Sequence, residues 1–189
     1  RVCLGEAVAD EHIDTFHPRP YLLTRAQFNP GSATVYVSGE IEFADNFLQG
    51  YGGSFAVMTR CEDRYGEGPE WAVSALAVGV RGNFWPAATR ENHVLELHEK
   101  PSSRALTFLT GAGLDIDPRS RSYNFLLRDD GESAMLTLQD AATPGKFNSI
   151  EQRTGASVEN RNGFIAFESC WGSPVKLDNV RIYRQRRHE

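Results

Sequence analysis

Two strand-like segments carry pairs of ionisable side chains on alternate residues. Glu40 and Glu42 form one pair, and Glu96 and His98 form the other. Residues i and i+2 of a strand point to the same face, so each pair should share a face. Two carboxylates can act as acid and base in glycoside hydrolysis, and a histidine base beside the cation of Arg60 suits a lyase. Glu96 and His98 are therefore candidate catalytic residues, and Arg60 and Glu40 candidate binding residues, provided that their strands share one sheet. The alternative is a solvated sheet face with cross-strand ion pairs.

Aromatic side chains offer a second kind of chemistry, because a flat ring stacks on the apolar face of a sugar. The chain has three tryptophans, Trp71, Trp85 and Trp171. Trp85 lies in a loop-like segment and Trp171 lies between the last two expected strands, which favours exposure of both. Tyr36 belongs to the same expected strand face as Glu40. These aromatic residues are candidate binding residues, and the alternative for the tryptophans is packing in the core or at its rim.

The segments that must position these residues have a hydrophobic period of two, which predicts strands. From Ala33 to Phe43, Val35 and Val37 alternate with polar residues. Residues 122–140 consist of a strand, a turn containing Asp130-Gly131 and a second strand, which is a strong hairpin signal. About ten short strands with turns between them, and no long segment of helical periodicity, predict an all-β fold. The expected architecture is a two-sheet antiparallel sandwich of jelly-roll type.

Two of the expected strands carry a further signal. Residues 71–80 are apolar on both faces and rich in alanine, which predicts a strand covered on both sides or at the floor of a groove. In the closing strand, Val175 and Leu177 have one parity, whereas Val180 and Ile182 have the other. This switch predicts a β-bulge at 178–179 that returns both pairs to the core.

Length and composition predict a single jelly-roll domain over residues 21–189, preceded by a polar arm over residues 1–20. The chain starts at Arg1, as a processed or trimmed chain would. Its net charge of −5 and the lack of a basic stripe interleaved with aromatics argue against nucleic acid as a partner. No apolar run approaches the ~18 residues of a membrane span. The three cysteines, Cys3, Cys61 and Cys170, form either one disulfide and a free thiol or three buried thiols.

Two motifs resemble the concanavalin A-like (laminin-G-like) jelly-roll superfamily. One is Gly163-Phe164-Ile165-Ala166-Phe167 followed by Val175-x-Leu177-Asp178-Asn179-Val180-x-Ile182, and the other is Gly53-x-Phe55-Ala56-Val57-Met58-Thr59-Arg60. The resemblance covers most of Ala33 to Arg184 and is nearest to bacterial saccharide-processing jelly rolls such as the 3-keto-glycoside hydrolase group. It implies that the partner is an oligo- or polysaccharide, which in this superfamily lies across the concave sheet. It also implies a secreted or periplasmic location.

The sequence departs from the catalytic motifs of these enzymes. The Glu-x-Asp-x-x-Glu run of the jelly-roll glucanases and the Gln-x-His motif of the alginate-lyase-like branch are absent. The strand that matches the Glu- and Gln-bearing strand of the keto-glycoside hydrolase group offers only Glu70, at its start. We therefore expect a carbohydrate-binding domain of a saccharide-processing system. The alternatives are a glycoside hydrolase or polysaccharide lyase with atypical catalytic residues, and a structural or protein-interaction jelly roll.

No cofactor is expected from the residues themselves. The resemblance implies calcium as an alternative, because calcium is common in this superfamily. Asp115 and Asp117, or Asp129 and Asp130, could supply its oxygen ligands. Turn chemistry alone explains the second pair.

Overall fold

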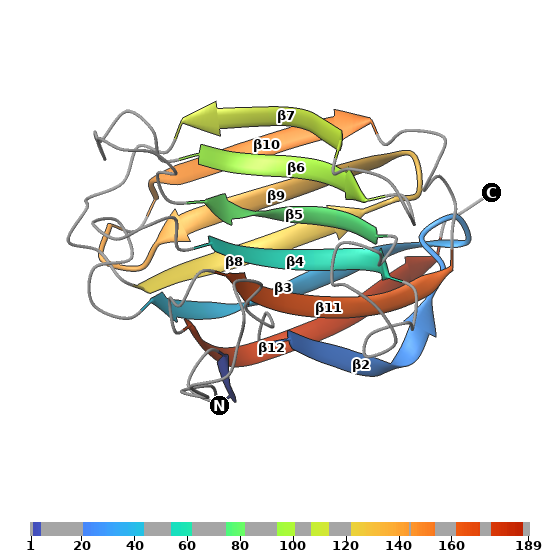
Figure 1. The fold of residues 1–189 in the computed structure, drawn as a ribbon, viewed down its shortest axis with the longest axis horizontal. Coiled ribbons are helices and arrows are strands. Elements are labelled where there is room, and N and C mark those ends of the chain that lie inside the picture. Colours follow the sequence, from blue (N-terminus) through green and yellow to red (C-terminus); the bar gives the residue numbers. More distant parts are fainter. Residues whose placement is uncertain are drawn as a thin grey trace, which may run out of the picture.

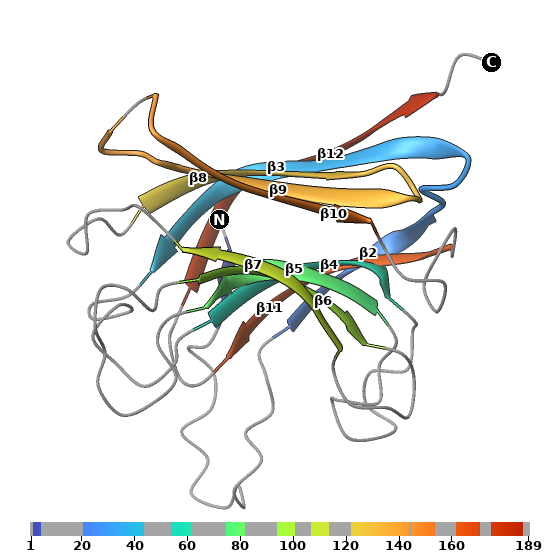
Figure 2. The same cartoon turned by 90° about the horizontal axis from the view of Figure 1, so that it is seen from above.

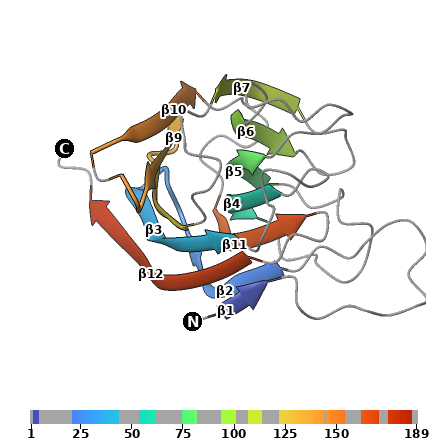
Figure 3. The same ribbon diagram turned by 90° about the vertical axis from the view of Figure 1, so that its left-hand side faces the viewer.

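The structure is a computed structural model that describes residues 2–4, 21–43, 54–61, 75–81, 94–100, 107–113, 122–143, 145–153, 162–170 and 175–186. Within these ranges every helix or strand is a β-strand, and the strands form two six-stranded antiparallel sheets (Figure 1). Sheet A has the order β1-β12-β3-β8-β9-β10, and sheet B has the order β2-β11-β4-β5-β6-β7. The sheets face each other as two layers (Figures 2 and 3), which confirms the predicted all-β sandwich.

The strands of sheet A are β1 (Val2–Leu4), β3 (Ala33–Phe43), β8 (Ser122–Asp129), β9 (Ser133–Asp140), β10 (Phe147–Arg153) and β12 (Val175–Arg186). Those of sheet B are β2 (Tyr21–Phe28), β4 (Ser54–Cys61), β5 (Ala75–Arg81), β6 (Val94–Lys100), β7 (Thr107–Gly113) and β11 (Gly163–Cys170). Two strands differ from the sequence expectation. β1 lies within the expected polar arm, for which the sequence predicts no strand, and its three residues pair with β12. β10 escapes prediction because Asn148 and Ile150 are its only buried residues, which leaves a weak hydrophobic alternation.

The core lies between the two sheets and consists of the alternate, inward-facing residues of their strands. Phe125 of β8 is at its centre, with its ring centroid 5.9 Å from that of Phe55 on β4 and 6.4 Å from that of Phe167 on β11. The other large members are Val35, Val37, Ile41, Val57, Tyr123, Leu127, Leu136, Leu138, Ile150, Ile165, Val175 and Leu177. Burial of these apolar groups is the main force that holds the sheets together.

The β8–β9 hairpin closes as the sequence predicts. Asp130 N donates to Ser133 O at 3.1 Å, and Gly131 has a φ of 90°, a conformation that favours glycine. Asp130 Oδ1 accepts hydrogen bonds from the backbone N–H groups of Glu132 and Ser133 at 3.0 and 2.7 Å. Partial burial raises the pKa of Asp130, but these bonds, the Ser133 hydroxyl and the charge of Arg128 outweigh it and hold the pKa below its ordinary value of 3.8.

The predicted bulge in β12 is present. The register between β12 and β3 shifts between Asp178 and Arg181, so Asn179 and Val180 together oppose a single residue of β3. Asn179 has a φ of 51°, which is left-handed backbone. Beyond the bulge Ile182 packs against the core, as expected. The expectation that Val180 also reaches the core is wrong: it is a bulge residue outside the regular alternation and is exposed.

Candidate functional site

Glu96 and His98 lie on β6, between β5 and β7 in sheet B. The register pairs Glu96 with Gly79 of β5 and with Gly111 of β7, so both positions beside it lack a side chain. Gly79 also pairs with Ala56 of β4, which completes a row of four residues across the sheet. Both chain neighbours of Ala56 are core residues, so the row belongs to the outer face of sheet B. In Figure 2 the strands of this sheet arch toward sheet A, which makes that outer face concave.

Arg60 is buried in the interior instead of lying on an outer face. It is 1% exposed, and its Nε and Nη2 atoms donate to the two carboxylate oxygens of Asp129 at 3.0 and 2.5 Å. Thr59 Oγ1 donates to the same carboxylate at 2.6 Å. Asp129 belongs to β8, so this buried ion pair joins sheet B to sheet A. The expectation that Arg60 is a binding residue is therefore wrong, because its buried guanidinium has no access to a surface ligand.

An irregularity near the end of β4 turns Arg60 inward. Its φ is 58°, and the register between β4 and β11 shifts between Phe164 and Ala166. Gly163 of β11 lies directly against this point, where a Cβ would be 2.5 Å from Arg60 Cα and 2.3 Å from its carbonyl carbon. Only glycine permits such close backbone contact. Sequence alternation cannot reveal this, because the positive φ breaks the period of two at Arg60 itself.

Asp129 and Asp130, one of the two pairs considered for calcium, both have structural roles in the fold. Asp129 is fully buried, and besides Arg60 and Thr59 it accepts a hydrogen bond from Gly131 N at 3.0 Å. Asp130 caps the hairpin. Asp115 and Asp117, the other pair considered for calcium, lie outside the described residues. Within the part of the chain that the structure describes, no group of three or more histidine, cysteine, aspartate and glutamate side chains is placed to hold a metal ion.

Glu40, Glu42 and Tyr36 lie on β3 in sheet A, whereas Glu96 and His98 lie on β6 in sheet B. The two sheets of a sandwich are about 10 Å apart with a side-chain core between them. Glu40 and Glu42 are on the outer side of sheet A, because the alternate residues of β3 are core residues. The condition that these strands share one sheet is therefore not met, and neither glutamate of β3 shares a face with Glu96 and His98.

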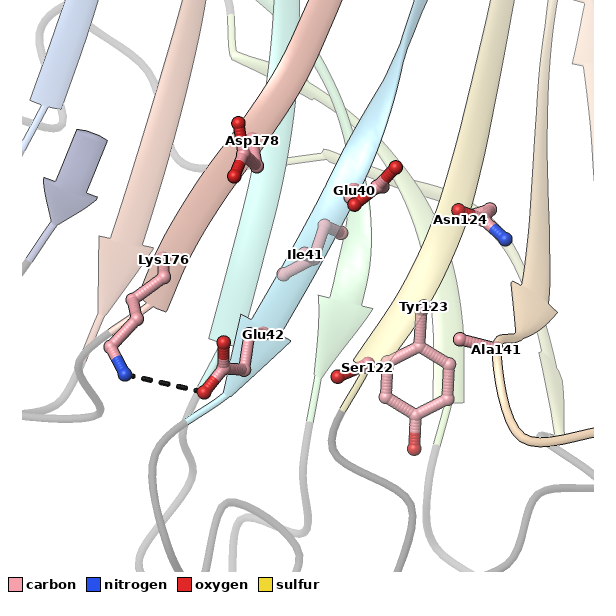
Figure 4. A pocket seen from close by; sticks show the side chains of 9 residues that line it. All are labelled: Glu40, Ile41, Glu42, Ser122, Tyr123, Asn124, Ala141, Lys176 and Asp178. Carbon is pink, nitrogen blue, oxygen red and sulfur yellow. Dashed lines mark hydrogen bonds and ion pairs between the residues drawn. The ribbon is translucent and has the colours of Figure 1, made fainter. Parts of the chain in front are cut away.

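A pocket of about 340 Å³ opens at the Glu42 end of this outer face, between β12, β3 and β8 (Figure 4). Lys176 Nζ donates to Glu42 Oε1 at 3.2 Å, which neutralises one of its carboxylates. Glu40 Oε1 accepts a hydrogen bond from Asn179 Nδ2 at 2.9 Å, and Asp178 pairs with Glu40 across the strands. The remaining lining residues are Ile41, Ser122, Tyr123, Asn124 and Ala141. The charged side chains that line the pocket are therefore predominantly acidic.

Tyr36 lies farther along β3 and stacks on Tyr183 of β12. Their ring centroids are 5.3 Å apart, with an angle of 18° between the ring planes. The hydroxyl of Tyr36 donates to Gln185 Oε1 at 3.1 Å. Tyr183 is 48% exposed, so this pair presents aromatic surface to solvent. The sequence signals Tyr36 by its parity, but the contact with Tyr183 depends on the β12 bulge, which changes parity within the closing strand.

The remaining candidate residues, Trp71, Trp85, Trp171 and Glu70, lie outside the described residues. Of the three cysteines, Cys61 is buried and is not part of a disulfide. No helix among the described ranges is long and apolar enough to cross a membrane.

Solved structures with this arrangement of strands are numerous, although their sequences are only distantly similar. The chain matches the CBM2 module of the evolved Dit of Lactobacillus casei BL23 phage J-1 with a TM-score of 0.55 and 12% identity, over 84% of this chain and 65% of that one, just under two thirds. It matches the exoplasmic/lumenal domain of VIP36 in its Ca2+/Man3GlcNAc-bound form with a TM-score of 0.61 and 11% identity, over 92% and 77% of the two chains. It matches the κ-carrageenase of Pseudoalteromonas carrageenovora, in complex with an oligotetrasaccharide of κ-carrageenan, with a TM-score of 0.52 and 16% identity, over 88% and 68%.

These likenesses establish the fold. The protein has the jelly-roll fold that its motifs imply. No family model and no curated protein matches the sequence.

Proposed function

We propose that the protein is a carbohydrate-binding jelly roll whose ligand lies on the concave outer face of sheet B, beside Glu96. The observation that carries the proposal is the row Ala56, Gly79, Glu96 and Gly111. Glycine inside a strand weakens it and often marks a place where a ligand approaches the backbone closely. Here glycine occupies both positions beside one carboxylate.

This row would suit a sugar for two physical reasons. The missing side chains leave room for a flat ring to lie on the sheet, and we expect the Glu96 carboxylate to accept hydrogen bonds from its hydroxyl groups. Hydrogen bonds to a charged group are stronger than those between neutral groups. His98, two residues along β6 and paired with Ala77, is expected to extend the polar edge. Trp71, Trp85 and Trp171 remain candidates for stacking on the ring. The sugar-bound VIP36 domain and κ-carrageenase support this proposal, because both have a saccharide bound on the same fold.

The test is a titration of intrinsic tryptophan fluorescence and of binding heat against soluble polysaccharides and their oligosaccharides. We expect Glu96→Gln to weaken the binding constant roughly tenfold or more, since a charged hydrogen-bond partner is lost. Gly79→Val should abolish binding by filling the row while it raises strand propensity and keeps the fold. Glu132→Gln, at an exposed hairpin position, is the matched control and should bind like the wild type. Equal binding by all three variants would refute the site.

A glycoside hydrolase or polysaccharide lyase is the second candidate. Glu96 and His98 are separated by one residue of β6, which places their Cα atoms roughly 7 Å apart, and so could act together on one sugar linkage. The same mixtures are therefore assayed for new reducing ends and for unsaturated products. Product that disappears in Glu96→Gln while binding persists would establish an enzyme, and binding without product would establish a binding domain. Neither binding nor product would favour a structural or protein-interaction role. The secreted or periplasmic location stays a prediction.

A further inference from the structure

The outer face of sheet A carries a second group of residues suited to a ligand, on the side opposite the proposed site. Tyr183 of β12 stacks on Tyr36 of β3, and 48% of its surface is exposed. Arg181 pairs with Ser38 in the same sheet, two residues before Tyr183, so Arg181 and Tyr183 share a face. Their Cα atoms are roughly 7 Å apart, which lets one small ligand contact both side chains.

Arg181 supplies a cation beside the two tyrosine rings. Arg181 is the arginine of β12 on this face, because the register places Arg184 and Arg186 opposite the inward-facing residues Val35 and Ala33. The guanidinium of Arg184 lies over the ring of Phe28, 5.8 Å from its centroid. Arg181 forms no hydrogen bond or ion pair in the described part of the chain, and all three arginines are exposed. Glu40 of the acidic pocket lies two residues along β3 from Ser38, the partner of Arg181, and its Oε1 atom accepts a hydrogen bond from Asn179. Arg181, Tyr183 and Tyr36 therefore form a strip of one cation and two stacked aromatic rings on a chain whose net charge is −5.

We propose that Tyr183, Tyr36 and Arg181 form a binding site for an acidic saccharide, that is, a sugar chain bearing sulfate or carboxylate groups. The planar guanidinium of Arg181 matches such an anion with two parallel N–H donors. The exposed tyrosine surface packs against the apolar side of the sugar ring. Gln185, already bonded to the Tyr36 hydroxyl, holds that ring in place. This site is independent of the row around Glu96, because the two lie on opposite faces of the sandwich.

The experiment is calorimetric titration of the whole chain with a sulfated galactan tetrasaccharide and with its desulfated form. We expect the sulfated probe to bind and the desulfated probe to bind at least tenfold more weakly. Arg181→Gln and Tyr183→Ala should each weaken the binding of the sulfated probe roughly tenfold, and Arg181→Lys should restore part of it. Arg25→Gln, at an exposed position on β2 of the other sheet, is the matched control and should leave binding unchanged.

Three results would overturn the inference. One is equal binding of the sulfated and desulfated probes, and another is the same loss in Arg25→Gln as in Arg181→Gln, which would show unspecific attraction. The third is an equal affinity for a single-stranded DNA oligonucleotide of matched charge, which would make the strip a general polyanion surface. Glu96→Gln should bind the sulfated probe at this strip like the wild type, so failure of the concave-face proposal and failure of this one are distinguishable.

Discussion

The buried ion pair between Arg60 and Asp129 provides the sharpest test of the structure. Both side chains are fully buried, and the pair connects β4 of sheet B to β8 of sheet A. Arg60→Met keeps most of the aliphatic volume and removes the charge. The Asp129 carboxylate then remains in the interior with hydrogen bonds from Thr59 and Gly131 but with no cation.

The expected loss follows from the cost of an uncompensated buried charge. Removing one partner of a buried pair typically destabilises a protein by about 3–5 kcal/mol. The free energy of unfolding of a domain is about 5–15 kcal/mol, so the variant should lose a fifth or more of its stability. The double variant Arg60→Met with Asp129→Leu removes both charges and should be more stable than Arg60→Met alone. It will not fully recover, because Thr59 and the Gly131 N–H group lose their acceptor.

The assay is equilibrium urea unfolding followed by tryptophan fluorescence. Arg153→Met is the matched control, because this arginine side chain is 83% exposed, and its substitution should change the free energy of unfolding by less than about 0.5 kcal/mol. An Arg60→Met midpoint equal to that of the wild type would refute the burial of the pair. Wild-type stability together with lost saccharide binding would restore Arg60 to the surface role that strand alternation predicts.

Three further predictions concern the backbone and pH. Gly163→Ala should destabilise the protein by about 1–3 kcal/mol in urea unfolding, because its Cβ would press on the backbone of Arg60 and relief requires β4 and β11 to separate. Asn179→Val should lower the free energy of unfolding by about 1 kcal/mol or more, because a β-branched residue is strained at a φ of 51°, whereas Asn179→Gly should be tolerated; equal stability of both variants would contradict the bulge. The pKa of Asp130 is lower in the folded chain than its ordinary value of 3.8, so the ionised carboxylate stabilises the fold at pH values above 3.8. This stabilisation is lost as the pH falls through the folded pKa. Urea midpoints measured from about pH 5 to about pH 2 should therefore fall less steeply in Asp130→Asn than in the wild type.

Hairpins and alternating strands could be predicted from the sequence, because their signals are local. The Asp130-Gly131 turn and the parity of Val35 and Val37 each depend on neighbours a few residues away. The change of parity in the closing strand likewise indicated the bulge at Asn179. β10 could not be predicted, since its strand character comes from pairing with β9 and not from its own hydrophobic pattern.

The grouping of candidate site residues was decided by the tertiary structure. The sequence by itself determined the two-sheet sandwich, through the period-two alternation of its apolar residues, and the pairs Glu40 with Glu42 and Glu96 with His98 within their strands. Only the order of strands decided that these pairs belong to different sheets, and only register placed Gly79 and Gly111 beside Glu96. Arg60 shows the physical reason. Its side chain lies in the core because it pairs with Asp129, 69 residues away in the sequence, and because Gly163 of β11 allows close contact with its backbone. Such long-range contacts do not alter the hydrophobic period of the sequence, so the sequence pattern cannot predict them.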